Sequence, residues 1–461
     1  MVLGLNSLKS FVNSFKKKIC DVYSKEHLEK LAKETGFRKR GNGKLSPQLF
    51  FEMLLFKKAD SRQISLNDHC AELMFNGVKV SKQSLHERFN QTSVDFVKRL
   101  VEEQLQNQIT SSIKTEALKG FTSVKIKDSI RYQIPENLKE KYPGSSGGAS
   151  GAAAHIQFEF DLISGRTTDL HLTGGYRQDT TDAFETVSSV KEGELIIRDL
   201  GYFSMDVLEK IQEQQAYFIS RLKPKVGIYQ LKEKKYVPLD LVALHQELKD
   251  KKLAYKELKV YIGNDKKLPV RLVAEALPED VTEKRLARAN KEAKKKGRSL
   301  SKDYKVYASL NLFITNVKEE ILKTMHVRSL YRLRWQIELR FKTWKSYFNI
   351  HKTKKMNCCR FECYLYASLL HILINWEIAI NFFEIIWKET DKSLSILKFF
   401  KIVVQHTAQL EKAVKEQGKL LDSYLTKLYQ TSLEKLLSEK KKGKACLAEI
   451  LSISIDNQQV I

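Results

Sequence analysis

The chain has few of the features that mark disulfide-bonded, zinc-binding or membrane-spanning proteins. Its 461 residues include six cysteines, with no CxxC pair and no histidines at zinc-finger spacing. A disulfide framework or a zinc finger is therefore not expected, and free thiols indicate a reducing cytoplasm. Cys358, Cys359 and Cys363 lie close together, and we interpret them as packing residues of a buried helix and not as a metal site.

Long apolar runs are scarce as well. The most apolar stretch, residues 364–386, contains His371, Asn375, Glu377 and Asn381. Polar residues spread along such a stretch predict a buried helix of a globular protein and argue against a membrane span. The first residues have no apolar core behind a basic segment, so they do not resemble a signal peptide.

Acidic residues are in deficit. Lys and Arg number 80 against 55 Asp and Glu, which gives a formal net charge of +25. The excess is spread over the whole chain, and it predicts a polyanionic partner, most often nucleic acid. An enzyme of small metabolites has little need of such a charge, and a basic surface that serves only solubility is the alternative.

Hydrophobic periodicity predicts a mixed sheet in the middle of the chain. The expected strands, with helices around the fourth, are at 124–128, 155–162, 166–172, 194–199, 216–221 and 310–315. This order predicts the α/β (mixed α+β) class, with a ribonuclease-H-like catalytic core, a β-rich insertion and flanking helical regions. The expected boundaries are 1–115 for the helical N-terminal region, 116–223 and 309–360 for the core, 224–308 for the insertion and 361–461 for the helical C-terminal region.

The insertion is rich in lysine and has short strand-like pieces. We expect strands at 237–241, 258–262 and 270–274, and a charged helix at 283–296. A lysine run within it is more typical of a solvated face than of a phosphate contact. After residue 352 the chain is expected to be helical to about residue 453.

Two short helices near the N-terminus are joined by Asn76 and Gly77, and Ser81 can cap the second. Together they predict a helix-turn-helix-like unit. The polar side of the second helix carries Lys82, Gln83, His86 and Arg88. Reading of DNA by this helix and simple packing of a helical hairpin both fit the pattern.

Three carboxylates stand where a ribonuclease-H-like sheet would bring them to one edge. Asp128 is late in the first strand, Asp199 ends a later strand, and Glu338 is on the helix after the insertion. Three such groups repel one another unless divalent cations bind between them, and Mg²⁺ suits oxygen ligands. Two ions about 4 Å apart can activate an attacking oxygen and stabilise a leaving one, which cuts or joins phosphodiesters. Taken singly, an aspartate at a strand end is usually a turn or cap residue.

The segment from Tyr331 to Lys345 supplies a second constellation. On one continuous α-helix, Tyr331, Arg334, Glu338 and Lys345 would project from a single stripe. The apolar flank beside that stripe would pack into the core; it consists of Leu333, Ile337, Phe341, Trp344 and Phe348. A carboxylate among cations beside a core suits a metal ion that must meet phosphate, and a salt-bridged surface is the alternative.

The spacing Tyr-x2-Arg-x3-Glu-x6-Lys resembles the YREK signature of insertion-sequence-four-type DDE transposases. Further segments resemble this family between about residues 45 and 360. They are Asp128-Ser129 with Gln133-Ile-Pro135, Tyr142-Pro-Gly144, Phe160-Asp-Leu-Ile-Ser-Gly165, Asp199-Leu-Gly-Tyr-Phe203, Ile219-Ser-Arg-Leu-Lys223 and Phe313-Ile-Thr-Asn316. The resemblance implies an N-terminal DNA-binding region, a ribonuclease-H-like core and a C-terminal region used for dimerisation.

The resemblance also implies roles for individual residues. Asp128, Asp199 and Glu338 would be catalytic and hold two Mg²⁺ ions, for which Mn²⁺ can substitute. Tyr331, Arg334 and Lys345 would grip phosphates near the transposon end, where a planar guanidinium and a point charge suit phosphate oxygens. Arg221 and Lys223 would be further DNA contacts.

The function implied is cut-and-paste DNA transposition in the bacterial cytoplasm, at the nucleoid and with no membrane. A homodimer would bind the inverted-repeat ends of its element, cleave them and join the 3′-hydroxyls to target DNA. One rival is a ribonuclease-H-like nuclease or resolvase that cuts without joining. The other is a catalytically inactive DNA-binding regulator, against which the full set of acids and signature residues argues.

The chain departs from the family in one respect. Relatives have a tryptophan just before the strand that corresponds to Phe313–Thr315, and it stacks on a flipped base during hairpin formation. Leu310 and Asn311 stand there in this chain, and no Trp lies between Asp199 and Trp335. Either a tyrosine such as Tyr304 or Tyr307 replaces that ring, or the hairpin step is handled differently; stacking contributes about 1–3 kcal/mol per base.

Overall fold

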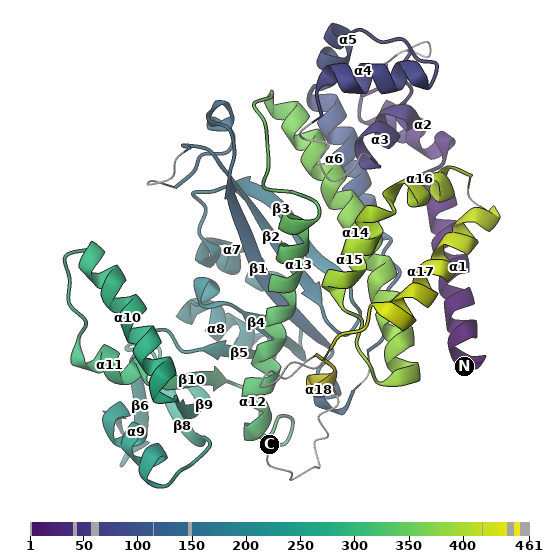
Figure 1. Ribbon diagram of the computed structural model, residues 1–461. Helices are drawn as coiled ribbons and strands as arrows, with labels where there is room; N and C mark the ends of the chain where they lie inside the picture. The colour runs from purple at the N-terminus through teal and green to yellow at the C-terminus, as the bar shows by residue number, and fades with distance from the viewer. Residues whose placement is uncertain are drawn as a thin grey trace. The chain divides into compact units, whose positions relative to one another are not determined.

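The computed structural model describes residues 2–39, 44–56, 64–113, 115–145, 150–416, 418–439 and 447–451 (Figure 1). The chain forms two compact units, each assembled from segments far apart in the sequence. Unit 1 comprises Met1–Ile113, Ser129–Arg177 and Gln336–Ala448, and unit 2 comprises Lys114–Asp128, Gln178–Trp335 and Glu449–Ile461. The four regions expected from the sequence are distributed over these units, and their boundaries stay a prediction.

Unit 1 is mainly helical. Its N-terminal helices are α1 (Val2–Val22), α2 (Lys25–Glu34), α3 (Pro47–Leu55), α4 (Leu66–Phe75), α5 (Lys82–Arg88) and α6 (Gln91–Gln106). Its later helices are α13 (Trp335–Ser346), α14 (Cys358–Thr390), α15 (Ile396–Gln405), α16 (Thr407–Glu416) and α17 (Gly418–Lys435). The short α18 (Leu447–Leu451) follows, while the lysine run at 440–442 and the helix expected beyond 451 lie outside the described residues.

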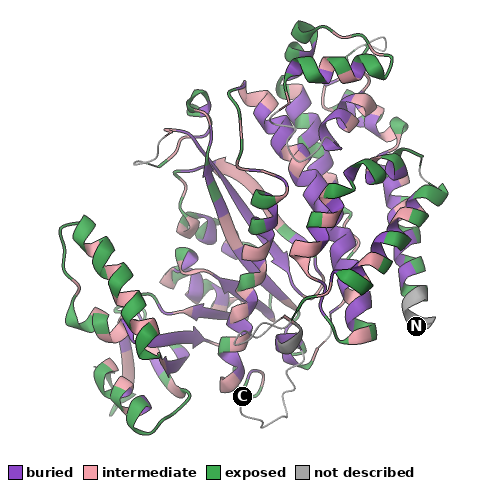
Figure 2. Ribbon diagram, viewed as in Figure 1, coloured by how far each residue is buried: buried purple, intermediate pink, exposed green. Residues whose placement is uncertain are grey.

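Helix α14 forms the centre of unit 1. It is long and apolar enough to cross a membrane, but 94% of its most apolar window is buried inside the protein. Figure 2 shows α14 largely in the colour of buried residues. Its buried Glu377 accepts hydrogen bonds from Lys18 of α1 at 2.6 Å and from Gln104 of α6 at 2.8 Å. The prediction of a buried helix is therefore confirmed, and side chains of two neighbouring helices hold its Glu377 carboxylate.

The helical hairpin expected near the N-terminus is present in unit 1. The Ser65 hydroxyl and the Asp68 carboxylate form a capping box at the start of α4, and the Ser81 hydroxyl accepts from the Ser84 N–H at the start of α5. Between the two helices Gly77 adopts φ of +79°, a conformation that glycine reaches without strain. The turn chemistry therefore explains why the chain reverses there.

The strands follow the order β3-β2-β1-β4-β5-β10-β9-β8-β6-β7. In unit 1, β2 (Ala153–Asp161) and β3 (Thr167–Gly174) are antiparallel, next to the second half of β1 (Ser123–Gln133). In unit 2, β4 (Glu194–Arg198) runs parallel to the first half of β1, and β5 (Tyr217–Arg221) runs parallel to β4. Helices α7 (Asp179–Thr186) and α8 (Met205–Glu213) join these strands, so the first five strands have the ribonuclease-H-like order.

The insertion of unit 2 extends the sheet. Its strands β6 (Ile228–Lys232), β7 (Lys235–Pro238), β8 (Lys256–Ile262) and β9 (Leu268–Ala276) join through β10 (Leu310–Thr315), which is antiparallel to β5. The insertion also contains α9 (Leu241–Asp250), α10 (Glu279–Lys295) and α11 (Lys302–Ala308). No residue of α10 is buried (Figure 2), as its charged composition predicts.

One predicted strand of the insertion is partly wrong. The expected strand 237–241 ends at Pro238, and helix α9 begins at Leu241. The reason is Asp240, whose carboxylate accepts hydrogen bonds from the N–H groups of Val242 and Ala243 and so caps the helix. The strands expected at 258–262 and 270–274 lie within β8 and β9, as predicted.

Candidate active site

The register of two neighbouring strands places Asp128 beside Asp199. In the parallel pair of β1 and β4, Lys127 lies opposite Arg198. The next residue on each strand is an aspartate, and adjacent strands are only about 4.8 Å apart. The two carboxylates therefore stand side by side where β4 ends and a short 3₁₀ turn begins at Leu200.

Arg334 shows that these carboxylates face the same space. Its Nη1 lies 3.4 Å from Oδ2 of Asp128, and its Nε lies 3.8 Å from Oδ1 of Asp199. The three groups are parts of unit 2. One guanidinium can reach both acids only if they converge, so the pairing of Asp128 with Asp199 rests on contacts as well as on register.

The residues before the two aspartates are buried cations. Because successive side chains of a strand point to opposite faces, Lys127 and Arg198 point away from the face of the aspartates. The Lys127 ammonium pairs with Asp182 of α7 at 2.5 Å and donates to the Thr186 hydroxyl at 3.3 Å. The two lysines in the first half of β1 thus do not form a solvated face, because Lys125 and Lys127 are buried and held in ion pairs.

The segment that carries the signature is not one continuous helix. Helix α12 (Thr324–Tyr331) ends at Tyr331, a 3₁₀ turn covers Arg332–Arg334, and α13 begins at Trp335. The expected single α-helix is therefore wrong, because a 3₁₀ turn, which advances about 120° per residue where an α-helix advances about 100°, interrupts it. The shared stripe of the four side chains stays a prediction. Tyr331 and Arg334 precede the helix that carries Glu338 and Lys345. The predicted apolar flank is confirmed, since Leu333, Ile337, Phe341, Trp344 and Phe348 are all buried.

Tyr331 is buried at the end of α12. It is 7% exposed, and its ring lies 5.4 Å from that of Phe313 of β10. Burial raises the pKa of the Tyr331 phenol to about 12, and the Arg334 charge opposes this rise. The phenol therefore keeps its proton near neutral pH and can donate a hydrogen bond to an anion.

Glu338 and Lys345 belong to α13 of unit 1. Glu338 is half-buried in the first turn, where the helix dipole favours a carboxylate, and Lys345 is exposed in the last turn. The two aspartates belong to unit 2, so the association of Glu338 with them stays a prediction. Along the chain, Glu338 follows Arg334 by four residues.

Two further predicted DNA contacts lie at the end of β5. Arg221 is half-buried, paired in register with Phe313 of β10, and its charge acts on the phenol of Tyr331. Lys223 is exposed just beyond the strand. A cation at each of these positions extends the positive charge from Arg334 along unit 2.

The predicted N-terminal DNA contacts differ in accessibility. Lys82, Gln83 and His86 are exposed on α5, and the Gln83 amide donates to Glu87 at 2.8 Å. Arg88 is half-buried, with its guanidinium 4.9 Å from the centre of the Phe37 ring. Three of the four side chains are thus presented to solvent, whereas Arg88 takes part in packing.

The position that holds a tryptophan in relatives is interior here. Leu310 and Asn311 are buried in β10, and the Asn311 amide oxygen accepts from Arg285 at 2.7 Å. Tyr307 donates to the backbone carbonyl of Leu222, so its hydroxyl is engaged. Sequence reasoning missed a different ring: Trp335, between Arg334 and Glu338, is 55% exposed. Its place inside the signature is the signal that could have identified it.

The donor set at the paired aspartates fits a hard divalent cation. Asp128 and Asp199 offer only oxygen atoms, which Mg²⁺ and Mn²⁺ prefer. Their side chains are 19% and 46% exposed, so an ion can reach both. Arg334 supplies the positive charge between them in this structure.

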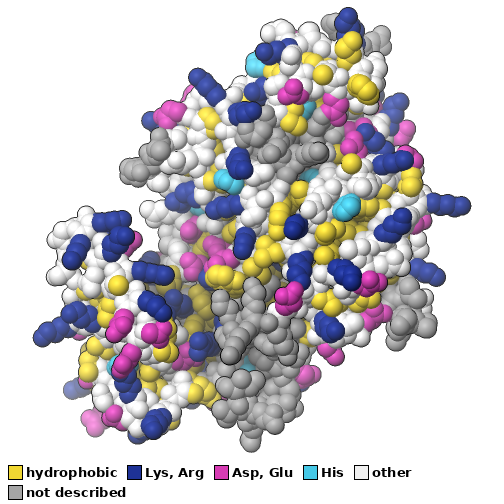
Figure 3. Space-filling model, viewed as in Figure 1, with side chains coloured by type: hydrophobic (Ala, Val, Ile, Leu, Met, Phe, Trp, Pro, Cys, Tyr) yellow, Lys and Arg dark blue, Asp and Glu magenta, His cyan; other side chains and the backbone are white. Residues whose placement is uncertain are grey.

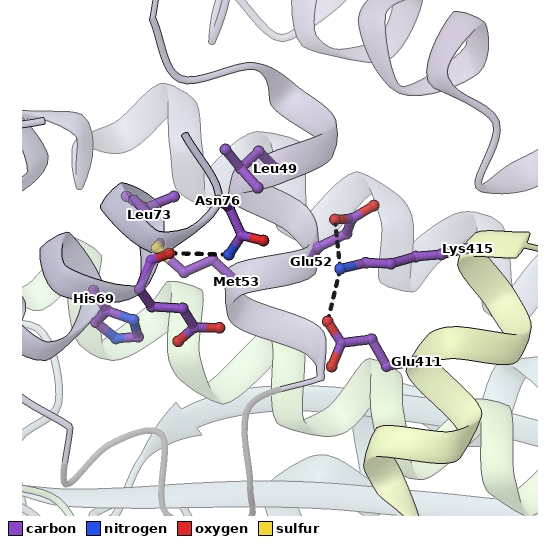
Figure 4. A pocket seen from close by; sticks show the side chains of 9 residues that line it. Leu49, Glu52, Met53, His69, Leu73, Asn76, Glu411 and Lys415 are labelled. Carbon is purple, nitrogen blue, oxygen red and sulfur yellow. Dashed lines mark hydrogen bonds and ion pairs between the residues drawn. The ribbon is translucent and has the colours of Figure 1, made fainter. Parts of the chain in front are cut away.

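A pocket in unit 1 does not offer such a set. It lies between α3, α4 and α16, and Lys415 there bridges Glu52 at 3.1 Å and Glu411 at 2.8 Å (Figure 4). Two of its carboxylates are therefore already neutralised by one ammonium group. Elsewhere Lys and Arg side chains are scattered over the visible face and do not form a single patch (Figure 3).

The sequence is similar to those of known transposases. A family model described as the transposase DDE domain matches residues 119–374. The transposase for insertion sequence element IS231B of Bacillus thuringiensis subsp. berliner is 31% identical over 440 residues, which are 92% of this chain and 91% of that one. The transposase for insertion sequence element IS1151 of Clostridium perfringens is 30% identical over 411 residues, or 86% of each chain.

A solved structure is also similar, at a greater distance. The piggyBac transposase synaptic complex with hairpin DNA aligns with a TM-score of 0.43 and 11% identity, over 94% of this chain and 87% of that one. A likeness of this size is too distant to assign residues.

Proposed function

Since the chain belongs to the family of DDE-domain transposases, we propose that Asp128, Asp199 and Glu338 are its catalytic acids. The chain is a DNA transposase. The observation that supports this assignment best is the contact of Arg334 with both aspartates, at 3.4 Å and 3.8 Å. Arg334 and Glu338 are four residues apart in the signature, so the same short segment that reaches the aspartates also carries the third acid.

The family uses divalent metal ions, and we infer two Mg²⁺ ions held by these acids, with Mn²⁺ as a substitute. Bound there, the ions would activate the attacking oxygen and stabilise the leaving one. Asp128 and Asp199 supply the shared oxygen ligands. Glu338 supplies a further carboxylate from the first turn of α13.

The cations around these acids suit the phosphate of the scissile strand. With divalent ions held by the aspartates, the Arg334 guanidinium would be free of them and could bind two phosphate oxygens. Tyr331 donates its phenolic proton as a hydrogen bond, since its pKa is about 12. Lys345 and Lys223 are exposed point charges for neighbouring phosphates, and Arg221 is a half-buried cation at the end of β5.

Contacts to bases and ends require other surfaces. Lys82, Gln83 and His86 are exposed on α5 and fit the reading of the inverted-repeat ends, and Arg88 supports that helix by packing. Trp335 is an exposed ring within the signature and fits stacking on a base near the cleaved bond. We infer that a homodimer holds two ends, with the C-terminal helices as its interface. Its place of action would be the bacterial cytoplasm, at the nucleoid.

The test is metal-dependent nicking of DNA that carries the element's ends. Asp128→Asn, Asp199→Asn and Glu338→Gln should each abolish nicking and leave end binding in a mobility-shift assay nearly unchanged. Glu319→Gln removes an exposed carboxylate of unit 2 and serves as the control, with nicking at the wild-type rate. Wild-type nicking by Glu338→Gln would refute the assignment.

Incubation with a target plasmid separates transposition from simple cleavage. A transposase yields products in which the 3′-hydroxyl ends are joined to target DNA. A ribonuclease-H-like nuclease or resolvase yields cut donor alone, and an inactive regulator yields neither. Joined products that need all three acids are the expected result.

A further inference from the structure

Arg340 of α13 is a buried cation between two aromatic rings. Its guanidinium carbon lies 3.0 Å from the centre of the Phe160 ring and 3.5 Å from that of Trp376. The two ring centres are 6.1 Å apart, so the guanidinium sits nearly on the line between them. Phe160 belongs to β2 and Trp376 to α14, and all three residues are parts of unit 1.

The charge of Arg340 has no counter-charge in the part of the chain that the structure describes. The residue is 4% exposed, and its Nη1 is buried without a hydrogen-bond partner. Burial holds the pKa of the guanidinium well below its usual range, with no nearby acid to oppose the effect. Burying an unpaired charge is costly, and the two ring faces compensate only in part through cation–π attraction.

The two rings are themselves held in place. The Trp376 indole N–H donates to the backbone carbonyl of Gly165 at 2.8 Å. Phe160 is fully buried in β2, and its ring is stacked with that of Phe158. The ring planes lie at 64° to each other, so the two rings form a rigid, wedge-shaped slot around the guanidinium.

This slot constrains the orientation of α13 more tightly than apolar packing does. The same helix also buries the apolar side chains of Ile337, Phe341 and Trp344. Hydrophobic contact is not directional, so these side chains alone would permit small rotations of the helix. A guanidinium held between two rings whose planes are 64° apart resists both rotation of the helix about its axis and sliding along it. Side chains extend about 5–6 Å from a helix axis, so a rotation of about 10° would move a carboxylate by roughly 1 Å.

We propose that Arg340, clamped between Phe160 and Trp376, is a positioning residue that sets the rotation of α13 and thereby the carboxylate of Glu338. The inference rests on the proposed role of Glu338 as a metal ligand. Glu338 precedes Arg340 by two residues on the same helix. A misplacement of about 1 Å at a catalytic group can cost about a hundredfold in rate, so a costly buried cation is explained by its effect on geometry.

The test uses the full chain and the substitution Arg340→Met, which fills the slot with a flexible apolar side chain of similar length. Lys342→Met removes an exposed cation from the same helix and is the matched control. Arg340→Lys keeps the charge but lacks the guanidinium group that fills the slot. Thermal melting gives the folded fraction, a mobility shift gives end binding, and nicking is measured in Mg²⁺ and in Mn²⁺.

We expect Arg340→Met to fold and bind ends like the wild type, and to nick about 10- to 100-fold more slowly in Mg²⁺. The loss should be smaller in Mn²⁺, a larger ion with the same ligands, because Mg²⁺ demands near-ideal octahedral geometry. Arg340→Lys should behave similarly, and Lys342→Met should nick at the wild-type rate.

Several results would overturn the inference. They are an unchanged nicking rate per folded molecule in Arg340→Met or Arg340→Lys, an equal loss with both metals, or an equal loss in Lys342→Met. If Arg340→Met does not fold, the same criteria apply to Arg340→Lys. Glu338→Gln is measured in parallel: if it nicks normally, the proposed function itself fails, whereas its loss beside a fully active Arg340→Met refutes only the role of Arg340.

Discussion

Replacing Arg334 by glutamine should tighten the binding of a divalent ion to the DNA-free protein while it slows nicking. In this structure the guanidinium contacts Asp128 and Asp199 together, so an ion that takes both carboxylates must compete with it. The same guanidinium is expected to grip phosphate during cleavage. Removal of the guanidinium should therefore strengthen metal binding and slow the nicking of DNA.

The size of the effect follows from the two contacts. The pair with Asp128 is half-buried at 3.4 Å, the long end of hydrogen bonding, and a bond between charged groups contributes about 1.5–3 kcal/mol. The pair with Asp199 is 3.8 Å long and its carboxylate is 46% exposed, so solvent screening leaves it below about 1 kcal/mol. A total near 2 kcal/mol corresponds to roughly 30-fold tighter metal binding.

Calorimetric titration of Mn²⁺ into the full chain measures this affinity. Arg328→Gln is the control, because Arg328 of α12 pairs with Glu275 of β9 and its replacement removes the same charge from unit 2. Metal binding by Arg334→Gln that is no tighter than that of the wild type would refute the competition. An equal gain in Arg328→Gln would show that net charge, and not the contact, is responsible.

Three further outcomes test the packing and the exposed ring. Burial lowers the pKa of His371 to about 4 from about 6.5, so the unfolded chain binds more protons than the folded chain between these pH values. The free energy of unfolding, measured by urea titration, should therefore fall by about 2 kcal/mol from pH 7 to pH 5. This pH dependence should be lost in His371→Phe. Lys127→Met removes the ammonium group that pairs with the buried Asp182 carboxylate and should cost about 3–5 kcal/mol in chemical denaturation, most of which the double change with Asp182→Leu should restore. Trp335→Ala should leave the melting temperature unchanged, because the ring is 55% exposed, and weaken end binding by about 1–3 kcal/mol in a mobility shift; unaltered binding would exclude stacking.

The sequence was a good guide to elements whose pattern is local. The alternation at 310–315 predicted β10 at its observed bounds, and the strand at 194–199 matches β4 within one residue. Ser81 predicted the start of α5, because a cap acts within one turn. Strand β6 and helix α9 of the insertion were not predicted from the sequence, because short exposed elements have weak hydrophobic periodicity.

The candidate site was only partly within reach of the sequence. The residue types and spacing of the signature suggested Arg334 and Glu338, and expected strand ends suggested Asp128 and Asp199. The strand end expected at Asp128 was wrong, because β1 continues to Gln133, whereas Asp199 directly follows β4. The 3₁₀ turn at Arg332–Arg334 was not predicted, because a helical wheel assumes one constant advance per residue. Trp335 was not predicted either, since exposure depends on what packs nearby.

The amino-acid sequence by itself determined the chemistry available to this protein: its acids, its cations, its basic excess and the order of its strands and helices. Only the tertiary structure decided which of these groups meet. The register of β1 against β4 placed two aspartates side by side, and the same register turned Lys127 and Arg198 into buried cations behind them. In the sequence Arg340 resembles an ordinary surface charge, but in the structure it is buried between rings of β2 and α14. The physical reason is that periodicity and capping are local energies, whereas register, burial and ion pairing depend on partners far away along the chain.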